Sequence, residues 1–293
     1  MLDFLLISML CVIWGSTWLG IKIGLEDSPP FLSSAARFII SSSFLYILIR
    51  IKRLTIPKNN WSKIIIPGFL SFGLSYGLDY WGIQYIASGL AAVLFASLPF
   101  FMAIFAHYML KDEKLSWIKL LFLSIGFLGI VIIFWDQIHF SNSFKSILGM
   151  LAVIGAAICA GLSGVFTKRD LHQVDPIVIA CFQMIVGAVF LLLVGFSFEK
   201  LSDFKITSKS IGALIYLAFF GSILAFVTYF WLLKRIEATK LSLIAFVTPI
   251  IALILGSLIK QEQITPPLLL GSFLVILGIV GLNFLTPKSK KLT

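Results

Sequence analysis

Residues 89–110 read GLAAVLFASLPFFMAIFAHYML, a run of 22 residues without an aspartate, glutamate, lysine or arginine. An α-helix needs about 20 apolar residues to cross the hydrocarbon core of a bilayer. This run therefore predicts a transmembrane helix. Hydrophobic residues make up 59% of the 293-residue chain and charged residues only 12%. The folded chain cannot bury all of this apolar surface, and lipid is needed to cover the rest.

Nine further apolar runs of similar length flank this one. They cover residues 4–25, 31–49, 64–86, 117–135, 146–167, 177–196, 211–233, 241–259 and 268–285. The first run lacks the preceding basic stretch of a signal peptide, so we expect it to be retained as a span. The connections are too short to form a soluble domain. The sequence thus predicts an all-α integral membrane protein with ten transmembrane helices.

Basic residues are divided unequally between the two sets of connections. With the amino terminus inside, the inside connections hold sixteen lysines and arginines and the outside connections hold five. The positive-inside rule then places both termini in the cytoplasm, with the chain in the cell (inner) membrane. The net charge of +10 is explained by this topology signal, and no nucleic-acid partner is expected.

The chain resembles itself when it is shifted by about 150 positions. The coinciding pairs are Tyr80 with Phe230, Trp81 with Trp231, Ile86 with Ile236, Pro99 with Pro249, and Asp112 with Glu262. Residues 1–140 and 141–293 would then each hold five spans. Because five is odd, the second half enters the membrane from the opposite side, which predicts two inverted five-helix repeats.

Two stretches resemble a known family. One is the run Trp14, Gly15, Ser16, Thr17, and the other is QYIASGLAA at residues 84–92, followed by Pro99 and Glu113. Both are similar to EamA-type transporters of the drug/metabolite transporter superfamily. The resemblance covers nearly the whole chain, and it implies a ten-span secondary permease that commonly exports amino acids, related metabolites or drugs.

Three function classes suit a polytopic membrane protein of this size. A lipid-modifying enzyme would need clustered acids or histidines, but the three histidines are scattered along the chain. A channel would need a repeated polar ring. We therefore expect no enzyme but a permease that works by alternating access. The family resemblance implies that it moves a small organic metabolite, an amino acid or related compound, outward.

Cofactors and partners follow from the same pattern. No GxxxxGK[ST] phosphate loop occurs, and neither a metal nor a cofactor is expected. The predicted partners are a small-molecule substrate and the lipid bilayer. Two fused repeats can form a complete pathway, so a monomer is expected to suffice.

Asp79 and Arg37 lie at similar depth inside the predicted spans, where a charge needs a partner or water. One interpretation is a pair that lines the pathway and either binds a zwitterionic substrate or switches with protonation. The other is a structural ion pair that locks the second span to the third.

Aromatic residues add a second candidate site. Tyr76, Asp79 and Tyr80 share one helical face, and the repeat places Phe226, Tyr229 and Phe230 on the matching face of the eighth span. Two such faces could form an aromatic box for apolar or cationic solutes. The alternative is that 28 phenylalanines put aromatic rings everywhere.

Trp14 and Thr17 share a face near the middle of the first span, which makes them candidates to line the pathway. Gln84 and Gln183 are polar amides in or near spans that could bind substrate or a neighbouring helix.

Two prolines and one acid complete the set of candidates. Pro99 and Pro249 occupy equivalent places and could act as gating hinges or as static bends. Glu113 is expected to be exposed and to cap the start of the fifth span.

Overall fold

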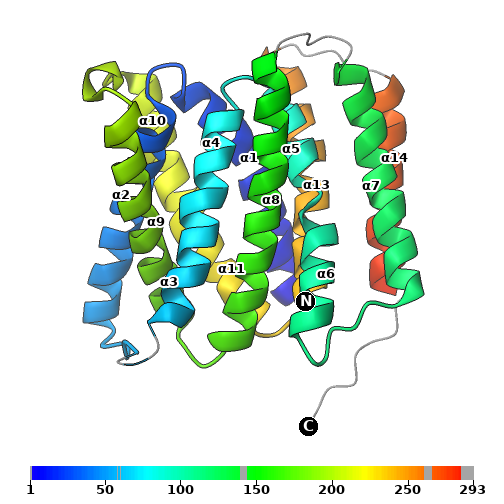
Figure 1. The fold of residues 1–293 in the computed structure, drawn as a ribbon, viewed down its shortest axis with the longest axis horizontal. Helices are drawn as coiled ribbons and strands as arrows, with labels where there is room; N and C mark the ends of the chain where they lie inside the picture. The colour runs from blue at the N-terminus through cyan, green and yellow to red at the C-terminus, as the bar shows by residue number, and fades with distance from the viewer. Residues whose placement is uncertain (1, 58, 60, 139–143, 261–265, 285–293) are drawn as a thin grey trace.

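The computed structural model describes residues 2–57, 59, 61–138, 144–260 and 266–284. Within them the chain forms ten helical segments that run along one direction as a single bundle (Figure 1). The first five are α1 (Leu2–Gly24), α2 (Pro30–Ile51), α3 with α4 (Ser62–Gly68 and Tyr76–Gly82), α5 with α6 (Ser88–Phe95 and Leu98–Met109) and α7 (Trp117–Ile138). The second five are α8 (Phe144–Asp170), α9 (Pro176–Phe198), α10 with α11 (Ser208–Ala218 and Ala225–Leu233), α12 with α13 (Ala238–Ser242 and Ile244–Lys260) and α14 (Pro266–Phe284).

Two of the ten segments contain a stretch of π-helix. In the third segment, η1 (Phe69–Ser75) joins α3 to α4, and in the eighth, η3 (Phe219–Leu224) joins α10 to α11. A π-helix bonds residue i to i+5 and so adds one residue to a turn. In η3 the Ser222 hydroxyl donates to the Leu217 carbonyl, five residues earlier, at 3.0 Å. The Ser222 side chain thus bonds a carbonyl that would accept from a backbone N–H in a regular helix. The apolar pattern of the sequence did not predict this irregularity.

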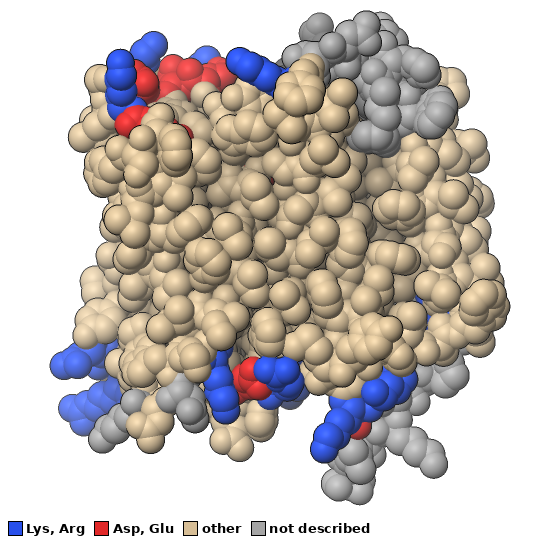
Figure 2. Space-filling model, in the orientation of Figure 1, with Lys and Arg blue, Asp and Glu red and all other residues tan. Residues whose placement is uncertain are grey.

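The surface of the bundle is suited to lipid. Six segments are individually long and apolar enough to cross a bilayer, and shorter apolar stretches occur in α7, in the ninth segment and in α14. Figure 2 shows charged side chains gathered at the two ends, with a broad uncharged band between them. Large apolar side chains such as Ile47 and Leu193 are exposed, at 57% and 65%. The protein is therefore embedded in a membrane and crosses it several times.

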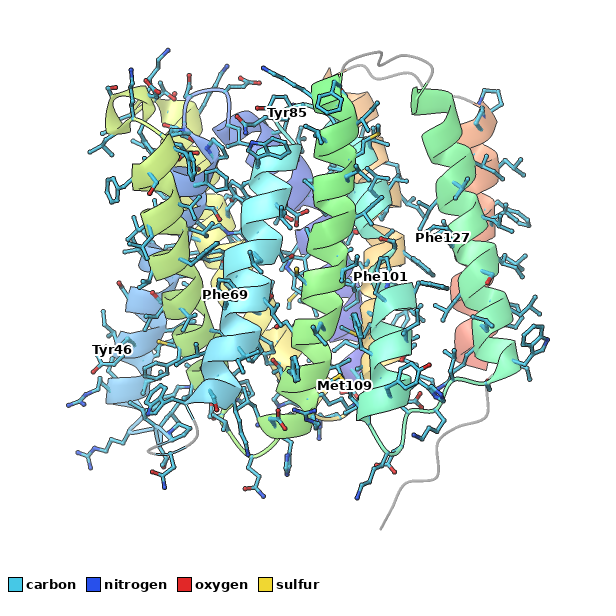
Figure 3. The ribbon with its side chains drawn as sticks, in the orientation of Figure 1. Tyr46, Phe69, Tyr85, Phe101, Met109 and Phe127 are labelled. Carbon is cyan, nitrogen blue, oxygen red and sulfur yellow. The ribbon has the colours of Figure 1, made fainter. Side chains whose placement is uncertain are left out.

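Helices from the two halves pack against each other. α2 packs along α9, α1 along α13, and α7 along α14, and the last pair stands at one side of the bundle (Figure 1). A Cβ atom at Gly129 would lie 2.5 Å from the Gly271 carbonyl oxygen, so α7 and α14 approach closely only because glycine is there. The Phe127 ring of α7 reaches toward the bundle and lies 6.0 Å from the Phe100 ring of α6 (Figure 3).

The structure ends the third segment earlier than the sequence predicts. It stops at Gly82, and residues 83–87 form a turn. The Nζ atom of Lys22 donates to the carbonyl oxygens of Ile83 and Ile86, at 2.6 and 2.9 Å. Lysine thus satisfies acceptors of this turn. Glu262, which matched Asp112, and the predicted end of the tenth span at 285 lie outside the described residues.

Candidate functional site

The bundle encloses a cavity between its two halves. The space open to the centres of water molecules inside it is about 110 Å³. Three segments of the first half line it, the first, third and fourth, together with three of the second half, the sixth, eighth and ninth. The structure brings six of the ten predicted binding residues to this cavity: Trp14, Thr17, Tyr76, Asp79, Phe226 and Tyr229.

Aromatic side chains form one side of the cavity. The Trp14 ring centroid lies 5.3 Å from that of Phe226 and 5.4 Å from that of Tyr229. Tyr76 and Phe226, from the third and eighth segments, are 6.1 Å apart. These tilted contacts are typical of stable aromatic pairs. The two aromatic faces that the sequence predicts do meet, although their role in binding stays a prediction.

Asp79 is the only charged side chain among the described residues that line the cavity. It is 6% exposed, and its Oδ1 atom has no hydrogen-bond partner in the part of the chain that the structure describes. A buried ionised carboxylate is unfavourable unless a cation or donors approach it. The cavity therefore presents an acceptor whose partner is not supplied by the neighbouring side chains.

Arg37 does not pair with Asp79, so the ion pair that the sequence suggested is not formed. Its guanidinium donates to the Ser222 hydroxyl at 2.7 Å and to the Gly221 carbonyl at 3.0 Å. It also donates to the Tyr80 hydroxyl at 3.2 Å and lies 4.9 Å from the centre of the Tyr76 ring. The planar guanidinium presents several donors at once and therefore suits the polar groups of the π-helix. This explains why Arg37 binds there and not to Asp79.

Comparisons with known proteins agree with this architecture. The model of the EamA-like transporter family matches twice, at residues 2–135 and 147–284. The chain belongs to this family. The uncharacterized transporter YoaV of Bacillus subtilis is 33% identical over 283 residues, which is 95% of this chain and 96% of YoaV.

A more distant relative of this EamA-like transporter matches it over nearly its full length. Protein PagO of Salmonella typhimurium is 26% identical over 285 residues, covering 94% of this chain and 92% of PagO. A solved crystal structure superposes with a TM-score of 0.79, covering 97% of this chain and 98% of the other, at 18% identity. At that identity the likeness shows the fold. The family match and the similarity to YoaV show that the chain is a membrane permease of the drug/metabolite transporter superfamily.

Three of the predicted binding residues lie away from the cavity. Tyr80 is 1% exposed and its hydroxyl accepts the bond from Arg37. Gln84 lies in the exposed turn after α4 and donates to the Trp81 carbonyl at 3.2 Å. Gln183 is fully buried in α9 and donates to the Thr167 hydroxyl at 3.0 Å. Arg37 is the fourth predicted binding residue outside the cavity lining. All four make contacts within the protein.

The two prolines occupy different positions in their helices. Pro99 stands at the start of α6, directly after a break at residues 96–97 that divides the fourth segment. Pro249 lies inside α13, six residues after the break at Leu243. The carbonyl that Pro249 leaves without a backbone donor is that of Ala245, and the Thr248 hydroxyl donates to it at 3.2 Å. Whether these sites act as hinges stays a prediction.

Sequence reasoning missed several lining residues of this transporter. Trp18 follows Trp14 by one helical turn, so the i+4 rule could have found it, whereas Phe230 was already placed on the predicted aromatic face of the eighth span and does line the cavity. Phe95, Ser163 and Thr248 come from segments for which no lining face was predicted. Among the described residues, no group of three or more His, Cys, Asp or Glu side chains could hold a metal ion.

Glu113 is buried, and it caps a different helix from the one predicted. Its carboxylate accepts from the amides of Ala238 and Thr239, at 2.8 and 3.2 Å, at the start of α12. It also forms an ion pair with Lys168 of α8 at 2.8 Å. The expectation of an exposed residue at the fifth span is wrong, because the orphan amides of the ninth segment lie closer.

Glu199 makes a similar contact at the opposite end of the bundle. Its two oxygens accept from the amides of Phe31 and Leu32, both at 2.9 Å, at the start of α2. α2 has no side-chain cap of its own, because Pro29 stands at the capping position. Burial raises the pKa of Glu199, while the two amide bonds lower it, with a net rise. We call these two contacts the Glu113 clamp and the Glu199 clamp.

Proposed function

We propose that this EamA-like transporter carries a small organic solute across the cell membrane by alternating access, with the central cavity as its binding site. The observation that carries this proposal is the shared lining, to which each half contributes three segments. Two halves that rock about a common site can expose it to one side of the membrane at a time. One chain forms the whole cavity, so we propose a monomer as the working unit.

The proposal includes an inverted arrangement of two five-helix repeats, residues 1–140 and 141–293. Three features support it. The family model matches each half separately. The π-helical stretches begin 150 positions apart, at Phe69 and Phe219. The cavity-lining faces at Tyr76 and Phe226 are separated by the same interval.

The proposed orientation follows from charge. The end at the bottom of Figure 2 carries several lysines and arginines. The helices α2, α6, α8 and α11 end on this side in Figure 1, and Arg50, Lys114, Arg169 and Lys234 lie at or just after their ends. The positive-inside rule assigns this end to the cytoplasm, together with both termini. Export of an amino acid or related metabolite is the direction and class that the family resemblance suggests.

The two clamps are suited to alternate as locks. In each, a glutamate of one half binds the helix start of the other half: Glu113 holds α12, and Glu199 holds α2. They lie at opposite ends of the bundle. Movement of the halves that opens one end would break one clamp and leave the other in place.

Solute flux in proteoliposomes tests the proposal. A panel of amino acids and amines would be offered with and without a pH gradient, and alternating access predicts saturable uptake that solute on the far side accelerates. Ser71→Trp places an indole in the cavity and should abolish flux. Ile65 belongs to the same segment and is 46% exposed, so Ile65→Trp is the matched control and should retain flux. Uptake that rises linearly with concentration, or that survives Ser71→Trp, would contradict the proposal.

A further inference from the structure

We infer that the cavity selects solutes that carry an ammonium group and no carboxylate, with Asp79 as the counter-ion. The inference rests on the proposed function and narrows its substrate class from amino acids and related metabolites to amines. Three properties of the lining support it: its charge, its hydrogen-bonding capacity and its aromatic rings.

The charge of the lining is that of one carboxylate. No lysine, arginine or histidine is among the described residues that line the cavity, and Asp79 is the one acid there. Its Oδ1 atom is buried and has no partner in the described chain. A cationic solute would supply the missing partner through a charge-assisted hydrogen bond.

Several hydroxyl groups at the cavity already use their protons elsewhere. Thr17 donates to the Trp14 carbonyl, Ser163 to that of Pro67 and Ser242 to that of Thr239, each at 2.7 Å. The oxygens of these groups therefore face a solute as acceptors. An ammonium group has three donors and no acceptor, which complements such a lining.

An amino acid fits this cavity less well than an amine does. Its carboxylate would need a cation, but the guanidinium of Arg37 lies outside the lining and is bound to Ser222, Gly221 and Tyr80. A buried carboxylate without a cation is unfavourable. The carboxylate of an amino acid would also place a second negative charge beside Asp79, which is unfavourable for the same reason.

Aromatic rings are positioned to hold the rest of the solute. One side of the cavity is formed by the rings of Trp14, Tyr76, Phe226 and Tyr229. Trp18 and Phe95 also line it and form another aromatic pair, with ring centroids 5.4 Å apart. Such faces attract apolar bodies and stabilise cations by cation–π contact. The geometry points to a monoamine with an aromatic or apolar body.

A series of solutes that share one scaffold and differ in charge tests the inference. Tyramine, tyrosine and 4-hydroxyphenethyl alcohol share one ring and differ in charge, as cation, zwitterion and neutral compound. Binding is followed by the change in tryptophan fluorescence, to which Trp14 and Trp18 in the cavity lining contribute, and flux is followed separately in proteoliposomes. We expect tyramine to bind and to be transported in preference to both other compounds.

Substitutions of the carboxylate make the test specific. Asp79→Asn should weaken tyramine binding by about tenfold or more, the effect of losing one charge-assisted bond, and leave the neutral alcohol unchanged. If the Asn variant fails to fold, Asp79→Glu provides a second test, and it should retain the preference for the cation. Asp203→Asn, at an exposed connection, is the control and should change nothing.

The outcomes separate the inference from the proposed function. Tyramine binding without any flux would overturn the proposed function and keep the inference. Failure of tyramine to bind, or equal preference for tyrosine, would overturn the inference. Equal loss of all three solutes in Asp79→Asn would also overturn it, because it would assign that residue a role that is independent of solute charge.

Discussion

The third and eighth helical segments contain the same backbone irregularity but differ in chemistry. Each contains a π-helical stretch, η1 or η3, followed by an α-helical turn that faces the cavity. At the position 150 residues after Asp79, the eighth segment has Tyr229. The comparison shows that the two halves share the shape of the site, whereas only one supplies its charge.

The neighbours of the two π-helical stretches differ as well. Around η3 the carbonyls accept polar bonds from the first half: Gly221 from Arg37 at 3.0 Å, and Ala218 from the Ser41 hydroxyl at 3.1 Å. Around η1 the contacts are mostly close packing, and a Cβ atom at Gly187 of α9 would lie 2.3 Å from Cβ of Phe72. Polar bonds thus predominate around η3, and close packing predominates around η1.

The largest effect is expected from removing the charged donor beside η3. Arg37→Met should lower the free energy of unfolding by about 3 kcal/mol, because Gly221 and Ser222 lose a charged partner in a buried site. The measurement is unfolding in mixed micelles of rising SDS content, followed by circular dichroism. Gln183→Met is the control beside η1 and should cost much less, because it removes one bond, from Nε2 to the Thr167 hydroxyl, together with an Oε1 atom that has no partner in the described chain. Equal losses in the two variants would remove the distinction.

An intermediate effect is expected from adding one methyl group beside η1. Gly187→Ala should destabilise the protein by about 2 kcal/mol, because the new Cβ atom would overlap Phe72 and α9 must move away. Gly212→Ala in α10 is the matched control, with nothing within 4 Å of the added atom, and it should be neutral or slightly stabilising. The same micelle titration distinguishes them. A harmless Gly187→Ala would show that the third segment is not held by close packing.

The smallest effect is expected for the polar bond near η1. Ser163→Ala removes the donor to the Pro67 carbonyl, a bond of 2.7 Å, and should cost about 0.6 kcal/mol, a usual value inside membranes. Ser197→Ala, whose hydroxyl donates to the Leu193 carbonyl within its own exposed helix end, should cost less. A loss for Ser163→Ala as large as that for Arg37→Met would mean that both segments depend on hydrogen bonds.

Much of the architecture could be predicted from hydropathy, because lipid imposes a fixed length on every apolar helix. Helical spacing also pointed to Tyr76 and Asp79, and the internal repeat pointed to Phe226, and all three line the cavity. The partner of Arg37 could not be found in this way, since it depends on the wider turn at Gly221, which apolar periodicity does not signal. The contact of Glu113 with α12 was missed because it joins residues more than 120 positions apart.

The π-helical stretches also determine which changes in chain length the protein can tolerate. Each residue of a helix turns the chain by about 100°, so deletion of one residue from η3 would rotate Tyr229 away from the cavity without altering any side chain. A deletion in an exposed connection such as that containing η2 (Leu201–Asp203) would leave the cavity as it is. During evolution, gain or loss of a single codon in these two short stretches would therefore change selectivity more than many substitutions on the lipid-facing surface.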